Sequence, residues 1–276
     1  MYTEFSLVMR DKTEHFVRSF VPDNPKAILI LIHGKGEHGG RYTHFGNELE
    51  KNGYAVYVPD LRGHGKTRGR IGHTAPRNTI LDDVDEIILY AKIRHPDLPV
   101  FIYGHSMGGN IILNYRHRRP DGIKAFIASA PWLYLVKEFS APLKKFVIAF
   151  SKLLPNTAIS TGIDATVITS IEAEQKEYLK DKKINGVITA ATVADVFVAT
   201  NEIFKYAPTD KTPFLLLHGD DDRLVDVNGS RKLAKLSGEL CSYKEYKANR
   251  HEILHDISRD DAINDMLFYL EAQLTK

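Results

Sequence analysis

Ser106 lies in a short motif whose residue types suit nucleophilic chemistry. Residues 104–108 read GHSMG and fit the pattern G-x-S-x-G. An apolar run over 100–103 precedes the motif and an amphipathic pattern begins at Met107, so we expect a strand, a tight turn and a helix. Glycines two residues on either side of the serine remove β-carbons that would clash in so sharp a turn. The turn would then present the Ser106 hydroxyl at the carboxyl end of a strand.

A serine hydroxyl needs a base to take its proton, and the base needs a third group that orients it. Of the twelve histidines, His251 combines a short loop after an expected strand (241–247) with the chain order serine, acid, histidine. The acid is expected after the strand 214–218, in the run Gly219-Asp220-Asp221-Asp222. Charge alone does not choose among these three aspartates.

Attack on an ester carbonyl develops a negative charge on oxygen, which backbone N–H groups can stabilise. Met107, at the start of the expected helix, would supply one N–H group. We assign the second to Lys35, in the loop HGKGEH (33–38) after the expected strand 27–32, and we expect its side chain to point elsewhere. Glycines also suit a phosphate cradle, but the P-loop pattern G-x-x-x-x-G-K-[ST] is not present, which disfavours a nucleotide site.

A metal site is the rival interpretation of His251. Residues 251–255 read HEILH and match the letters of the zinc motif H-E-x-x-H. That motif needs a position within a helix and a third ligand, whereas here it follows a strand and a loop. We therefore expect neither a metal nor an organic cofactor.

The elements around these residues alternate between buried strands and amphipathic helices. Strands are expected at 27–32, 54–59, 100–103, 123–130, 214–218 and 241–247, and helices at 42–51, 78–93, 229–236, 257–274 and from residue 107 onward. A hairpin is expected over 4–9 and 15–20. The pattern predicts an α/β fold, with a mostly parallel central sheet and helices on both faces. It fails over 131–205, which we interpret as a helical cap inserted between core segments 1–130 and 206–276.

Composition narrows the class of partner. The chain has 276 residues, 43% of them hydrophobic and 26% charged, which is typical of a globular protein. A net charge of +2 does not suggest nucleic acid. The basic run 116–119 is interpreted as solvent-facing cations at a helix end. The single cysteine, Cys241, is expected half-buried in a strand, and the N-terminal residues lack the apolar run of a signal peptide, so a cytoplasmic protein is expected.

Taken in order, five motifs resemble those of one family. They are HGxGEH with Arg41 and Tyr42, DxRGHG at 60–65, GHSMGG at 104–109, GxxD at 219–222, and His251. Together they resemble the monoacylglycerol lipase and lysophospholipase branch of the α/β-hydrolase superfamily, over nearly the whole chain. The resemblance implies that Asp222 is the triad acid and that a helical cap follows the sixth strand of the fold. The cap segment 154–164 is also similar to the lipase cap.

The resemblance implies a serine hydrolase that cleaves carboxylic esters, above all monoacylglycerols or lysophospholipids, through Ser106, His251, Asp222 and an acyl-enzyme. Two positions depart from the family: Lys35 stands where a small residue is usual, and Trp132 where an aliphatic one is. The bulk of Trp132 could narrow an acyl channel, which keeps an esterase or thioesterase for short or aromatic acyl groups as the alternative. A peptidase and a non-catalytic binding protein on the same fold are weaker alternatives.

Contacts with lipid are expected from the cap. The side chains expected to line the substrate site are Trp132, Phe139, Phe146 and Phe150. The segment 139–154 could also touch a membrane surface, with lysines 144, 145 and 152 near phosphate headgroups. The alternative is a cap helix packed against its own protein. The partners expected are a small acyl ester and, peripherally, a membrane, with the oligomeric state open.

Overall fold

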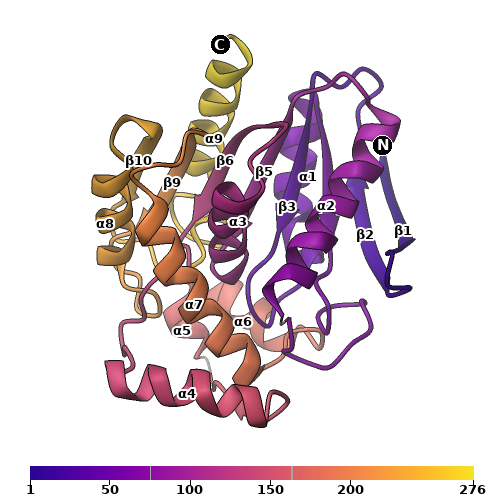
Figure 1. Ribbon diagram of the computed structural model, residues 1–276. Coiled ribbons are helices and arrows are strands. Elements are labelled where there is room, and N and C mark those ends of the chain that lie inside the picture. The colour runs from indigo at the N-terminus through magenta and orange to yellow at the C-terminus, as the bar shows by residue number, and fades with distance from the viewer. Residues whose placement is uncertain (75, 163) are drawn as a thin grey trace.

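A mixed central sheet organises the molecule (Figure 1). The computed structural model describes residues 1–74, 76–162 and 164–276. Within them the sheet has eight strands in the order β1-β2-β4-β3-β5-β6-β9-β10. Their bounds are β1 Tyr2–Val8, β2 Glu14–Phe20, β3 Ala27–Ile32, β4 Tyr54–Pro59, β5 Val100–His105, β6 Ile123–Ser129, β9 Phe214–Gly219 and β10 Cys241–Tyr246.

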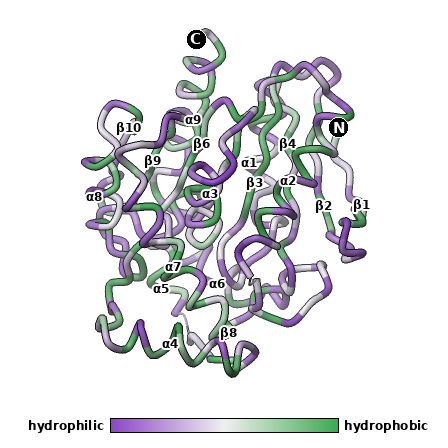
Figure 2. The backbone as a smooth tube through the Cα atoms, in the orientation of Figure 1, coloured by the Kyte–Doolittle hydropathy of each residue, from purple (hydrophilic) through white to green (hydrophobic). Residues whose placement is uncertain are grey.

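Strand direction follows from the connections. β1 and β2 form an antiparallel hairpin, and β2 also pairs antiparallel with β4. From β4 to β10 all neighbouring strands are parallel. Every residue of β3, β4 and β5 is buried, as expected for strands covered on both faces. Figure 2 shows the matching concentration of hydrophobic residues along the central strands. The predicted mostly parallel α/β sheet is confirmed.

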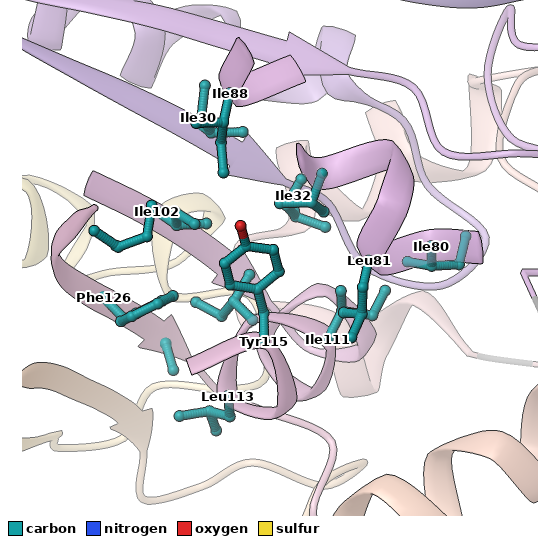
Figure 3. Packing of buried hydrophobic residues seen from close by; sticks show 14 of the residues in the cluster. Ile30, Ile32, Ile80, Leu81, Ile88, Ile102, Ile111, Leu113, Tyr115 and Phe126 are labelled. Carbon is teal, nitrogen blue, oxygen red and sulfur yellow. The ribbon is translucent and has the colours of Figure 1, made fainter. Parts of the chain in front are cut away.

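Helices cover both faces of this sheet and enclose two cores. One core joins the sheet to α2 (Arg77–Arg94), α3 (Met107–Arg118) and α8 (Val227–Ser237). Figure 3 shows part of it, where Tyr115 of α3 lies near Ile102 and Phe126 of the sheet. The second core joins the opposite face to α1 (Thr43–Lys51) and α9 (Arg259–Leu274). Burial of apolar side chains on both faces is what stabilises this arrangement.

The chain between β6 and β9 is the segment expected to form the cap. It contains α4 (Ala141–Leu153), α5 (Ala165–Ile168), α6 (Glu172–Lys180) and α7 (Ala190–Tyr206). Figure 1 shows α4, α5 and α6 together at one end of the sheet, opposite the C-terminus. A two-stranded antiparallel ribbon, β7 (Ala158–Ser160) and β8 (Val187–Thr189), was not expected, because three-residue strands give almost no sequence pattern. Ile163, in the lipase-like segment, lies outside the described residues. The division into core and cap stays a prediction.

Two smaller expectations have opposite outcomes. Cys241 is half-buried in β10, as predicted. The interpretation of the run 116–119 as solvent-facing is wrong for Arg116, which is only 2% exposed. Its guanidinium pairs with Asp210 at 2.9 Å and lies 4.4 Å from the ring centre of Phe214. A tertiary partner 94 residues away decided this burial, which no local pattern indicates.

Candidate active site

Ser106 lies in a strained turn between β5 and α3. Its φ is +53°, in a region that residues other than glycine rarely adopt. A β-carbon added at Gly104 would lie 2.4 Å from the Gly108 carbonyl oxygen, and one at Gly108 would lie 2.2 Å from the Ile32 carbonyl oxygen. Both glycines are therefore required by close backbone approach. The predicted strand, tight turn and helix are present, with Ser106 at the carboxyl end of β5.

His251 and Asp222 meet at this edge of the sheet. Nδ1 of His251 lies 2.7 Å from Oδ2 of Asp222, and both side chains are almost fully buried. The backbone N–H groups of Leu224 and Val225 donate to the other carboxylate oxygen, at 2.8 and 2.9 Å. This fixes the carboxylate in one orientation. The neighbouring Asp221 instead pairs with the exposed Arg223, away from the histidine.

Burial and ion pairing have opposite effects on the pKa values of Asp222 and His251. Burial raises the pKa of Asp222, but the charges and hydrogen bonds of His251 and His218 hold it well below its ordinary range. Burial lowers the pKa of His251, yet the Asp222 carboxylate outweighs that effect and raises it above its ordinary value of 6.5. His218, near the end of β9, contacts the same carboxylate. Its Nε2 lies 3.1 Å from Asp222 and its Nδ1 lies 2.7 Å from Ser230.

The loop after β3 lies directly beside the serine. A β-carbon added at Gly34 would lie 3.1 Å from the Ser106 β-carbon, so the backbone of this loop passes against the nucleophile turn. The N–H group of Gly34 is used by Oε1 of Glu37, at 2.6 Å. The Lys35 side chain extends to the segment after β6, where Nζ donates to Thr161 at 2.6 Å, and both residues belong to the wall of the cavity that contains Ser106.

A cavity of about 300 Å³ lies between the sheet edge and the segment that follows β6. Ser106 and His251 are both in its wall, together with Trp132 and Phe139. The remaining wall is mostly apolar. Of the four side chains expected to line the substrate site, Trp132 and Phe139 therefore line this cavity.

Phe146 and Phe150 lie differently from what was expected. The described lining of the cavity includes neither of them. Phe146 is 62% exposed and stacks on Phe150 with ring centres 5.8 Å apart. Val147 of the same helix lines the cavity instead. Because α4 carries apolar residues around most of its circumference, periodicity alone did not show which stripe faces inward.

A buried charge network links the loop after β3 to the histidine loop. Arg41 binds Glu252 through two hydrogen bonds of 2.6 and 2.7 Å, and it also contacts Glu37 at 3.4 Å. Glu37 further accepts a hydrogen bond from Tyr42 at 2.7 Å. One arginine thus serves two carboxylates. Burial raises the pKa of Glu37, whereas Arg41 outweighs burial at Glu252 and lowers its pKa to about 2.

Sequence reasoning noted these four residues without giving them a role. Glu37, Arg41 and Tyr42 belong to the motif after β3, and Glu252 follows the histidine directly. The sequence on either side of these residues is mostly polar, so no local pattern indicated that their charges are buried. Their pairing across 211 residues could not be read from spacing.

The HEILH letters do not lie within a helix. His251 belongs to a loop, and Ile253–His255 forms a single 3₁₀ turn. His255 contacts Glu174 at 3.2 Å, while His251 faces Asp222. Over residues 1–74, 76–162 and 164–276, no three side chains of histidine, cysteine, aspartate or glutamate are arranged to hold a metal ion.

Comparison with known proteins places the chain in a family. Residues 23–258 match the model of the family described as serine aminopeptidase, S33. The chain belongs to this family of α/β-hydrolases. It is 28% identical to a monoacylglycerol lipase of Mycolicibacterium smegmatis, over 92% of each chain. It is 29% identical to a phospholipase of Bacillus subtilis, over 87% of this chain and 93% of the relative.

A solved structure supports the same family assignment. The monoacylglycerol lipase of Paleococcus ferrophilus superimposes with a TM-score of 0.86 at 28% identity, over 94% of this chain and 99% of that one. The family and the α/β-hydrolase fold expected from the motifs are confirmed.

Replacing Gly108 should test how tightly the nucleophile turn is packed. The methyl group of Gly108→Ala would force α3 away from β3, and a displacement near 1 Å can lower activity about 100-fold. Overpacking of this kind also destabilises by about 1–3 kcal/mol. We expect both losses when kcat/KM on a p-nitrophenyl ester and urea unfolding are measured.

Gly186→Ala is the matched control, because an added β-carbon there meets nothing within 4 Å. It should keep both values near those of the wild type. A Gly108→Ala protein that is more stable, as helix propensity alone would make it, would contradict the packing argument.

Proposed function

We propose that the chain cleaves monoacylglycerols or lysophospholipids by a mechanism that uses Ser106, His251 and Asp222. Similarity to lipases and a phospholipase over the length of the chain supports hydrolysis of lipid esters. The chain is a carboxylic ester hydrolase. The observation that supports the triad most directly is the 2.7 Å contact of His251 with Asp222, at the wall of the cavity that also contains Ser106.

The proposed reaction passes through an acyl-enzyme. Ser106 attacks the ester carbonyl while His251 accepts its proton, and His251 then donates that proton to the departing alcohol. Water repeats the sequence and releases the fatty acid. Asp222 holds the imidazole in the tautomer that leaves Nε2 free to accept, and it stabilises the imidazolium that forms.

The N–H groups of Lys35 and Met107 are proposed to hold the oxyanion. Met107 begins α3, and Lys35 lies in the loop that passes against Ser106. Loss of one such donor typically costs about 3 kcal/mol of transition-state stabilisation. The network of Glu37, Arg41 and Glu252 would fix the positions of the loop after β3 and the loop that carries His251. Glu37 accepts a hydrogen bond from the Gly34 N–H group, and Glu252 follows His251 in the chain.

The segment 131–205 is proposed to act as a cap that receives the acyl chain. Trp132, Phe139 and Val147 give the cavity an apolar wall above the serine. The N–H group of Trp132 donates to the carbonyl oxygen of Ser106 at 2.9 Å, which holds the start of the cap against the nucleophile turn. Since Trp132 lines the cavity, an esterase or thioesterase for short or aromatic acyl groups is the second candidate.

Activity on a graded series of esters tests this proposal. We expect kcat/KM on 1-monoacylglycerols and lysophospholipids to peak at medium or long acyl chains. Ser106→Ala should lower it by about 10⁴-fold or more and abolish labelling by a fluorophosphonate, because only an activated serine reacts. Ser242→Ala, at an exposed serine of β10, is the control and should match the wild type. Turnover confined to short or aromatic esters would favour the second candidate.

The pH profile should report the pKa of His251. Because neutral imidazole is the base, activity must fall as pH drops through this pKa, which Asp222 raises above 6.5. Asp222→Asn removes the carboxylate, so the acid limb of kcat/KM should move to lower pH and the plateau should fall by about 10⁴-fold. Asp221→Asn is the control at an exposed neighbour. An acid limb that stays in place in Asp222→Asn would argue against the assignment.

Peripheral contact with a membrane is proposed for the outer face of α4. No helix in the described residues is both long and apolar enough to cross a bilayer. Phe146 and Leu153 are nevertheless 62% and 81% exposed, and Lys145 and Lys152 are exposed beside them. Exposed apolar side chains next to lysines suit the interface of an anionic membrane.

Removing one aromatic side chain tests this contact. Phe146→Gln should weaken co-sedimentation with vesicles of phosphatidylcholine and phosphatidylglycerol by about tenfold, the effect of keeping one large apolar side chain out of lipid. Phe268→Gln is the matched control, because Phe268 is 78% exposed on α9, away from α4. Equal weakening by both variants, or no binding by the wild type, would rule out α4 as the contact.

A further inference from the structure

A lysine stands in the wall of the cavity close to the candidate nucleophile. Nζ of Lys35 donates to Oγ1 of Thr161 at 2.6 Å and approaches the carbonyl oxygen of Asn185 at 3.4 Å. Both partners are neutral oxygens. In the described residues no carboxylate forms an ion pair with this ammonium group, and burial lowers the pKa of Lys35 to about 8. Lys35 is partly buried, and partial desolvation of an ammonium ion without a counter-ion is costly, so an anion beside it would offset part of that cost.

The two carboxylates in the cavity wall do not supply this anion. Glu252 is held in a bidentate pair by Arg41. Glu37 accepts hydrogen bonds from Gly34 and Tyr42 and also contacts Arg41. Lys35 is the only lysine or arginine in the described lining of the cavity. Its charge is therefore available to a ligand.

The cavity wall has an apolar cluster and a set of hydrogen-bonded polar residues, which meet at the β7–β8 ribbon, because Thr161 lies two residues after Ile159 and Ile159 pairs with Ile188. Trp132, Phe139 and Val147 pack with Ile188 and Val193 in one apolar cluster. The polar lining is joined separately, since Lys35 bonds Thr161 and Glu37 bonds the backbone of Gly34 next to Lys35. An acyl chain fits the apolar cluster. The polar end, on the loop beside Ser106, is then left for the alcohol part of the ester.

From this arrangement we propose that the Lys35 ammonium group binds an anionic headgroup, so that the preferred substrates are monoacyl glycerol esters carrying a phosphate monoester. This inference rests on the proposed ester hydrolysis, which it refines without adding a reaction step. Phosphate oxygens would accept the hydrogen bonds that Lys35 now gives to Thr161 and Asn185. Neutral monoacylglycerols would lack this charge-assisted contact.

Binding of non-hydrolysable ligands tests the preference without turnover. The probes are 1-O-alkyl-glycerol 3-phosphate and the matching 1-O-alkyl-glycerol, titrated calorimetrically below their critical micelle concentrations at pH 7. We expect the wild type to bind the phosphate about tenfold or more tightly, the size typical of a charge-assisted hydrogen bond. Lys35→Met should reduce that ratio to near one. Should this variant fail to fold, Lys35→Gln and the charge-preserving Lys35→Arg replace it, with the ratio lost in the first and kept in the second.

Lys182→Met is the matched control. Lys182 is an exposed lysine three residues before Asn185, so its loss changes the net charge equally without altering the described cavity wall. It should keep the wild-type ratio. An equal effect of both variants would show attraction by overall charge and overturn the proposal.

Two further results would also overturn it. Equal affinity of the wild type for both probes, or equal weakening of both in Lys35→Met, would mean that Lys35 only fastens the cap through Thr161 and Asn185. Preference for a glycerol ether whose alkyl chain ends in a carboxylate, if lost in Lys35→Met, would place the anion on the chain instead of the headgroup.

Turnover of the matching esters separates this inference from the proposed function. A Ser106-dependent kcat/KM that is higher for the phosphate ester, with the ratio lost in Lys35→Met, supports both. If neither ester is cleaved while the phosphate ether still binds more tightly, the hydrolysis proposal fails and the binding inference stands. If both esters are cleaved equally and the ethers bind equally, hydrolysis stands and the role of Lys35 fails.

Discussion

The close approach of three backbone segments around Ser106 is the constraint on which the site depends. Gly104 and Gly108 allow β5, α3 and the end of β3 to touch without β-carbons between them. A positive φ at Ser106 costs of the order of 1–3 kcal/mol, and the surrounding backbone hydrogen bonds offset that cost. The Ser106 N–H group donates to Ser129, and its carbonyl oxygen accepts from Asn110 and Trp132. The sheet, the helix and the start of the segment after β6 therefore hold one strained residue in place.

Buried charges give the same edge of the sheet a second set of constraints. Asp222 is oriented by two backbone N–H groups and shared between His251 and His218. Next to His251 in the chain, Glu252 is bound by Arg41, while Glu37 accepts a hydrogen bond from the loop after β3. Removing one member of such a buried set leaves another charge without a partner, which is why these groups act together. The loop after β3 and the loop that carries His251, which both contribute to the cavity wall, are thus coupled through charge.

The cavity wall has an apolar part and a polar part. Its apolar part, built mainly by the segment after β6, removes hydrocarbon from water, and this non-directional effect tolerates many acyl chains. Its polar part contains the partly buried ammonium group of Lys35, whose desolvation is costly without an anion. Discrimination among headgroups should therefore depend more on electrostatics at Lys35, and chain length more on the space near Trp132.

Sequence alone determined the strands of the central sheet, the order of the motifs and the family, because these depend on local pattern. β3 and β4 lie at the predicted bounds, since continuous apolar runs between turn residues are strong local signals. The glycines of the G-x-S-x-G motif predicted the tight turn equally clearly. The choice of Asp222 among the three aspartates as the expected acid followed only from the resemblance. In the structure, Asp222 contacts His251.

Tertiary structure alone decided the contacts between distant segments. The burial of Arg116, the direction of the Lys35 side chain and the pairing of Arg41 with Glu252 all depend on partners 94 to 211 residues away. The same holds for α4, where Val147 lines the cavity and Phe146 is exposed, because apolar residues around most of a helix leave the choice of the buried side to packing. Local pattern shows that a side chain can be buried, whereas its partner is set by the fold.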